Sequence, residues 1–168
     1  MSDATIVAQA LALEQVAVES YGAALAGGTP QTPLPQRMLE TLRRFQRQER
    51  QHVELLASTL DALGGRAEPP PADRAALTRA RTAAGLDHSL ERLRTPAEVG
   101  RFAIELENAQ IARYLDAVGA LQDPRLLEIA TQVMAAEGQH ATVLRGLLSD
   151  DVALTVPAAF ERGDAPFP

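Results

Sequence analysis

The feature that most constrains this chain is a short sequence that occurs twice. Glu49-Arg50-Gln51-His52 and Glu137-Gly138-Gln139-His140 both read Glu-x-Gln-His. Residues three apart lie on one face of an α-helix, so each glutamate projects toward the same point as its histidine. One such pair alone is most often an exposed ion pair. Two pairs on helices that pack together predict a shared site.

Glycine and proline mark the ends of the first two predicted helices. The first runs from about residue 2 or 3 to 25 and stops before Gly27-Gly28, because glycine favours the end of a helix. The second runs from about 36 to 63 and stops before Gly64-Gly65. Several prolines between these two segments prevent an earlier start of the second helix.

A second pair of helices is predicted in the other half of the chain. Thr95-Pro96 with Glu98 has the pattern of a capping box, which starts a third helix that continues to about residue 121. Asp123-Pro124 then caps a fourth helix that ends near residue 148. Almost no chain joins these two helices, so we expect them to be antiparallel neighbours.

The two helix pairs are separated by a crossover at about 66–94. Its prolines at 69–71 exclude a helix there, and shorter helical pieces are predicted at 73–84 and 87–93. With 168 residues, 46% hydrophobic and only 4% aromatic, the chain suits one domain of closely packed helices. We therefore predict an all-α, antiparallel four-helix bundle over 1–150, followed by an irregular tail at 151–168.

The first and third predicted helices share a second repeated spacing, between a glutamate and a tyrosine. Tyr21 follows Glu14 by seven residues, and Tyr114 follows Glu107 by the same interval. Seven residues are two helical turns, and side chains lean toward the helix N-terminus, so each tyrosine leans back toward the level of the glutamates. The chain thus reads as a duplicated helical hairpin.

Four glutamates in one bundle core need positive charge between them. Burying unpaired carboxylates costs several kcal/mol per charge, and two divalent cations would offset it. Because the chain has no cysteine, the ligands must be oxygen and imidazole nitrogen. This donor set predicts two iron ions, with manganese as the alternative.

Together these motifs resemble the ferritin-like di-iron carboxylate superfamily, in which two helices each contribute a Glu and two contribute Glu-x-x-His. The stretch 106–148 is similar to bacterial ferritin-like domain proteins of poorly defined function. The resemblance implies two terminal ligands, two bridging carboxylates and two imidazole ligands: Glu14 and Glu107, Glu49 and Glu137, His52 and His140. It also implies that Tyr21 and Tyr114 hydrogen-bond the site carboxylates, although a plain core role and a redox role remain equally open.

Two departures from the resemblance shape further expectations. Bacterioferritins bind haem through a methionine in the second-helix motif, where this chain has Arg50 and Gln51, so no haem is expected. The proline-bearing tail lacks the fifth helix typical of cage-forming ferritins. We therefore expect a monomer or small homo-oligomer, most plausibly a homodimer, in place of a storage cage.

The resemblance implies redox chemistry with O₂ or H₂O₂ and an electron donor, of the ferroxidase or peroxidase type. A non-enzymatic metal-binding or interaction module and an iron-storage ferritin remain alternatives. The sequence shows neither a leader peptide nor an apolar run of membrane-spanning length, which favours a cytoplasmic protein without a membrane partner.

Charge argues against a nucleic-acid partner. The net charge is −6, whereas a phosphate-binding surface needs an excess of basic residues. A local basic run, Arg43, Arg44, Arg47 and Arg50, lies on the polar side of the second predicted helix. We interpret this run as a solvated or interface surface.

Overall fold

A computed structural model describes residues 1–156, 162–164 and 167. Within these residues the structure is helical and contains no β-strand. The elements in chain order are α1 (Asp3–Leu25), α2 (Gln36–Ala62), α3 (Arg74–Ala83), the 3₁₀ turn η1 (Leu90–Arg92), α4 (Pro96–Ala120), α5 (Pro124–Leu148) and α6 (Val152–Thr155). The prediction of an all-α fold is confirmed.

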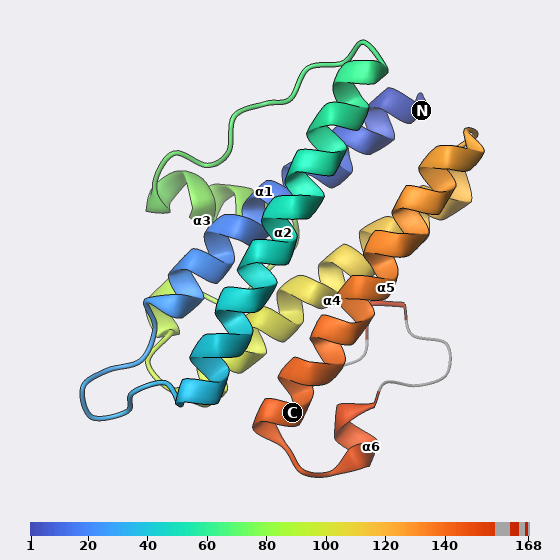
Figure 1. Ribbon diagram of the computed structural model, residues 1–168. Helices are drawn as coiled ribbons and strands as arrows, with labels where there is room; N and C mark the ends of the chain where they lie inside the picture. Colours follow the sequence, from blue (N-terminus) through green and yellow to red (C-terminus); the bar gives the residue numbers. More distant parts are fainter. Residues whose placement is uncertain (157–161, 165–166, 168) are drawn as a thin grey trace.

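Four long helices form two hairpins that pack side by side (Figure 1). α1 pairs with α2, α4 pairs with α5, and α1 also packs along α4. The start of α1 meets the end of α4, because the Asp3 carboxylate accepts hydrogen bonds from the backbone N–H groups of Gln122 and Asp123. α1 and α4 are therefore antiparallel. Among the described helices, none has the length and apolarity to cross a bilayer.

The helix ends lie close to their predicted positions. The capping box at Thr95 and Glu98 is present, and Asp123 caps α5. Gly28 and Gly64 have φ of 87° and 74°, a conformation that glycine adopts without strain, so the chain turns after α1 and α2.

Two predicted regions differ from the structure. In the crossover, the piece expected at 87–93 forms only the 3₁₀ turn Leu90–Arg92, whereas the 73–84 piece is present as α3. In the tail predicted to be irregular, residues 152–155 form the short helix α6, capped by the Asp151 side chain. The rest of the tail prediction lies partly outside the described residues.

The hydrophobic core has two parts, one on each side of the bundle centre. One contains Tyr21, Leu42 and Phe45, and the other contains Leu56 and Tyr114. Apolar residues flank both repeated motifs: Met38, Leu42, Phe45, Leu56, Val133 and Leu144 are buried, whereas Leu127 and Met134 are partly buried. Between the two parts lie the polar residues of the motifs.

The crossover is fastened to the bundle by one buried arginine. Arg81 on α3 is only 2% exposed and donates hydrogen bonds to the Ser20 hydroxyl at 3.0 Å and the Glu105 carboxylate at 2.9 Å. Its guanidinium also lies 3.8 Å from the centre of the Phe102 ring. Glu105 accepts hydrogen bonds from the backbone of Asp87 and His88 as well. Glu105 therefore points away from the motif glutamates and pairs with an arginine.

Replacing Arg81 should loosen the crossover. Arg81→Met keeps the bulk but removes the Ser20 and Glu105 contacts, so we expect a loss of about 2 to 3 kcal/mol in the free energy of unfolding. Arg79→Met, on the exposed side of the same helix, is the matched control and should change it by less than about 0.5 kcal/mol. Equal stability of both variants in urea denaturation would contradict this role of Arg81.

Candidate metal centre

All six residues predicted to bind metal converge at the bundle centre. Each long helix contributes: the polar residues come singly from α1 and α4 and in pairs from α2 and α5, because an i, i+3 spacing places both members on the core side. The four glutamates are fully buried although carboxylates are among the most exposed groups in proteins. The six residues are Glu14, Glu49, His52, Glu107, Glu137 and His140.

These residues form two overlapping groups, each able to hold a cation. In one, Glu14 and His52 join Glu49 and Glu137; in the other, Glu107 and His140 join the same two glutamates. Within each group, one ligand atom from every residue lies within 4.8 Å of the others. Glu49 and Glu137 therefore belong to both groups, whereas Glu14 and Glu107 each belong to one.

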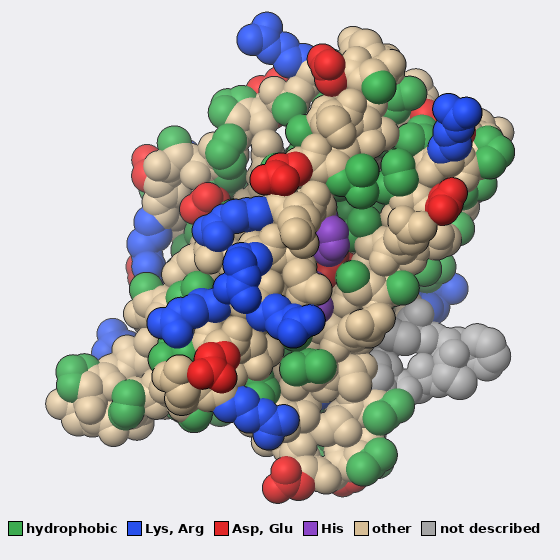
Figure 2. All heavy atoms as spheres, viewed as in Figure 1, with side chains coloured by type: hydrophobic (Ala, Val, Ile, Leu, Met, Phe, Trp, Pro, Cys, Tyr) green, Lys and Arg blue, Asp and Glu red, His purple; other side chains and the backbone are tan. Residues whose placement is uncertain are grey.

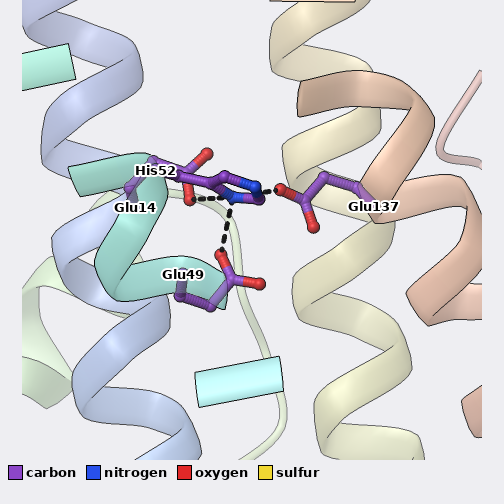
Figure 3. A group of neighbouring side chains, drawn as sticks. All are labelled: Glu14, Glu49, His52 and Glu137. Atoms are coloured by element: carbon purple, nitrogen blue, oxygen red, sulfur yellow. Dashed lines mark ion pairs between the residues drawn. The ribbon is translucent and has the colours of Figure 1, made fainter. Parts of the chain in front are cut away.

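His52 lies among three carboxylates that come from different helices (Figure 3). Its Nδ1 is 3.0 Å from an oxygen of Glu137 on α5, 3.5 Å from one of Glu14 on α1 and 3.6 Å from one of Glu49 on α2. One imidazole nitrogen thus faces carboxylates from both hairpins.

His140 has a matching environment built from the other oxygens. Its Nδ1 lies 2.9 Å from Glu137, 3.2 Å from Glu49 and 3.3 Å from Glu107. Glu137 and Glu49 each turn one oxygen toward His52 and the other toward His140. This split is the arrangement that a carboxylate bridging two ions would have.

The buried atoms at the centre fit the binding of metal ions. Oxygens of Glu49, Glu107 and Glu137 and the Nδ1 atoms of both histidines lack a hydrogen-bond partner among the described residues. Ligands held about 2.1 Å from one ion lie about 3.0 to 3.4 Å apart, close to most of the distances given above. Oxygen and imidazole donors with no sulfur suit iron or manganese.

Without metal, protons supply the positive charge. Burial opposes charge on His52 and His140, but the carboxylates that face each ring at close range raise the pKa of each to about 12. Burial and the charge of Glu49 raise the pKa of Glu14 to about 8. Burial likewise raises the pKa values of Glu107 and Glu137 above their usual range. The metal-free site therefore holds several protons near neutral pH.

The two tyrosines reach across between the hairpins. Tyr21 on α1 donates its hydroxyl hydrogen bond to Glu107 on α4, and Tyr114 on α4 donates to Glu14 on α1. Burial and the adjacent carboxylates raise the pKa of both phenols well above the usual value, so both stay protonated donors. Each tyrosine is level with the glutamates as the seven-residue spacing predicted, but contacts the glutamate of the opposite helix.

Two glutamines contribute contacts that the sequence analysis did not assign. Gln110, fully buried one turn after Glu107, donates from Nε2 to Glu14 at 3.0 Å and to Glu49 at 2.9 Å. Gln48 places its side-chain oxygen 3.1 Å from Nε2 of His140. The spacing of Gln110 from Glu107, three residues, was the signal that could have identified it. Both glutamines orient groups that face the proposed ions.

The two histidines are not equivalent. His140 is 3% exposed and stacks on Phe45 with ring centres 3.9 Å apart, whereas the His52 side chain is 14% exposed. His52 therefore lies at the solvent side of the site. The third histidine, His88, is outside the site and pairs with Glu105 in the crossover, at 3.1 Å.

Metal binding should release protons. Because the raised pKa values keep His52, His140 and Glu14 protonated near pH 7, ions must displace those protons. We expect affinity for Zn²⁺ to rise from pH 6 to pH 8, with more than one proton released per ion. Calorimetric titrations in buffers of different ionisation enthalpy measure this number. Binding that is independent of pH would contradict the assigned proton content.

Removing one histidine should remove one ion. In His140→Ala the group with Glu107 loses its imidazole, whereas the group with Glu14 and His52 stays complete. We expect native mass spectrometry to show a fall from two Zn²⁺ ions per chain to one, with helix content by circular dichroism unchanged. His88→Ala is the control and should keep two ions. An unchanged metal count in His140→Ala would show that the two groups are not separate positions.

Comparison with known proteins agrees with this geometry. A family model described as ferritin-like domain matches residues 2–150, which include all six residues of the site. Searches of curated proteins and of solved structures give no match to this chain.

Proposed function

We propose that this chain, which belongs to the ferritin-like domain family, binds two iron ions, with manganese as the alternative, and carries out redox chemistry with O₂ or H₂O₂. The observation that carries the proposal is the split of Glu49 and Glu137 between the two histidines. A site for one ion has no need of two carboxylates that each face both imidazoles. The chemistry is of the ferroxidase or peroxidase type.

The protein would hold each ion through one imidazole, one carboxylate that serves that ion alone, and two carboxylates that both ions share. Glu14 and His52 would serve one ion, and Glu107 and His140 the other, with Glu49 and Glu137 between them. When bound, iron supplies the electrons that reduce the oxidant.

The chain's own residues set the conditions for that chemistry. Full burial of the four glutamates excludes bulk water and strengthens every electrostatic contact at the centre. Tyr114 and Gln110 both donate hydrogen bonds to Glu14, and Tyr21 donates one to Glu107. These two carboxylates are therefore oriented before metal binds. Of the two shared carboxylates, Glu49 accepts a hydrogen bond from Gln110, whereas neither oxygen of Glu137 accepts one from the residues that the structure describes, so Glu137 is the freer to shift as the charge around it changes.

Anaerobic loading with Fe²⁺ followed by air or H₂O₂ tests the proposal. We expect a rapid ultraviolet–visible absorbance change that saturates at two iron ions per chain. Glu49→Gln removes one shared carboxylate and should abolish this saturation point. Glu54→Gln, an exposed glutamate on the same helix, is the matched control and should behave like the unaltered protein.

Three results would contradict the proposal. Tight Zn²⁺ binding without oxygen or peroxide consumption by the iron form would favour a non-enzymatic metal-binding module. Iron loading in the hundreds per particle would indicate storage. Equal behaviour of Glu49→Gln and Glu54→Gln would place the reacting iron outside this centre.

A further inference from the structure

Four exposed arginines lie together on α2, beside the metal centre. Arg43, Arg44, Arg47 and Arg50, here called the arginine face, occupy about two turns of the helix. Figure 2 shows basic side chains gathered over α2 and, next to them, histidine side chains at the seam between α2 and α5. This side of the bundle therefore combines positive charge with access to the site.

The arginine face is not explained by local stability. None of its four side chains lies within ion-pair distance of a carboxylate from the residues that the structure describes. Arg43 and Arg47 are four residues apart, and Arg47 and Arg50 three, spacings at which like charges destabilise a helix. The glutamate within this segment, Glu49, is fully buried and faces the core. The charge is thus available to a partner.

The position of the arginine face relative to His52 is informative. At about 1.5 Å per residue, Arg50 lies about 3 Å and Arg43 about 14 Å from His52 along the helix axis. His52 is the most exposed of the six site residues, and α2 and α5 pack against each other less extensively than either packs against its own hairpin partner. Around the helix, at about 100° per residue, Arg44 lies about 80° from His52 and the other three arginines lie about 140 to 180° from it. A molecule bound to the arginine face would therefore lie across α2 from the site, at a distance of about 10 Å, the width of one helix.

We propose that the arginine face docks an acidic redox protein that donates electrons to the metal centre, an inference that rests on the proposed function. Two donor molecules, each oxidised by one electron, would reduce one pair of ferric ions to ferrous ions. Guanidinium groups bind carboxylates through paired hydrogen bonds, so a carboxylate-bearing surface complements this face. Such charge pairing acts mainly by steering and orienting the partner.

Size and charge favour a protein over a nucleic acid. The face spans about 11 Å along α2, room for few phosphate contacts, and the chain as a whole carries a net charge of −6. A long polyanion would extend beyond the arginines onto acidic surface. A compact acidic patch on a small protein matches both the extent and the sign of the face.

Charge reversal tests the proposal. Arg43→Glu/Arg47→Glu/Arg50→Glu alters the face, and Arg66→Glu/Arg79→Glu/Arg125→Glu, three exposed arginines elsewhere, is the control with the same net charge. The probe is an acidic [2Fe–2S] ferredoxin. Its binding to the Zn²⁺-loaded protein is measured by calorimetry, and its reduction of the oxidised iron form by stopped-flow absorbance.

At low ionic strength we expect the first variant to weaken ferredoxin binding and to slow reduction at least tenfold, and the control to remain within twofold of the unaltered protein. Raising NaCl to about 200 mM should weaken binding only where the arginine face is intact. Dithionite, a small reductant, should reduce all three proteins at similar rates. Unchanged metal content and circular dichroism confirm that the variants fold.

Several outcomes would overturn the docking proposal. These are equal ferredoxin binding by all three proteins, absence of binding to the unaltered protein, and arginine-dependent binding of duplex DNA in place of ferredoxin. Dissociation of a homo-oligomer by the first variant alone would identify the face as a contact between copies. Failure of dithionite to reduce the iron form would instead contradict the proposed function. The binding measurement with the Zn²⁺-loaded protein would still test the docking proposal.

Discussion

Burial of four carboxylates at one point is the constraint on which this structure depends. Glu14, Glu49, Glu107 and Glu137 are fully buried, and uncompensated charges of this kind cost several kcal/mol each. In the metal-free protein, protons on His52, His140 and Glu14 offset part of the cost. Divalent cations would replace those protons without requiring the helices to move apart. Folding and metal binding therefore use the same side chains.

The centre also joins the two hairpins. Tyr21 and Tyr114 connect α1 with α4 through the glutamate of the opposite helix, and the contact of Gln48 with His140 connects α2 with α5. Because these polar contacts are directional, they fix the position of one hairpin along the other more closely than apolar packing does. The two halves of the centre are nevertheless unequal, because Phe45 stacks on His140 whereas His52 is partly exposed to solvent. A duplicated sequence has thus produced a centre with one protected and one accessible side.

Much of this arrangement could be predicted from the sequence, because its signals are local. Capping residues, glycines and prolines give the helix ends. The repeated Glu-x-Gln-His motif predicts that four of the site residues meet, and the repeated Glu–Tyr spacing adds Glu14 and Glu107. Contacts between residues that are far apart in the sequence leave weaker signals. Nothing in the arginine-containing, polar pattern of α3 indicates that Arg81 is buried against Ser20 and Glu105. Gln110 reaches Glu49 only because of how the hairpins are docked, which periodicity within a single helix does not specify.

The central claim is that the six residues hold two ions that share Glu49 and Glu137. A crystal structure of the iron-soaked protein, with anomalous diffraction at the iron edge, tests it most directly. We expect two peaks per chain, one beside Glu14 and His52 and one beside Glu107 and His140, with both shared carboxylates touching both peaks. A single peak, or iron bound away from these residues, would contradict it.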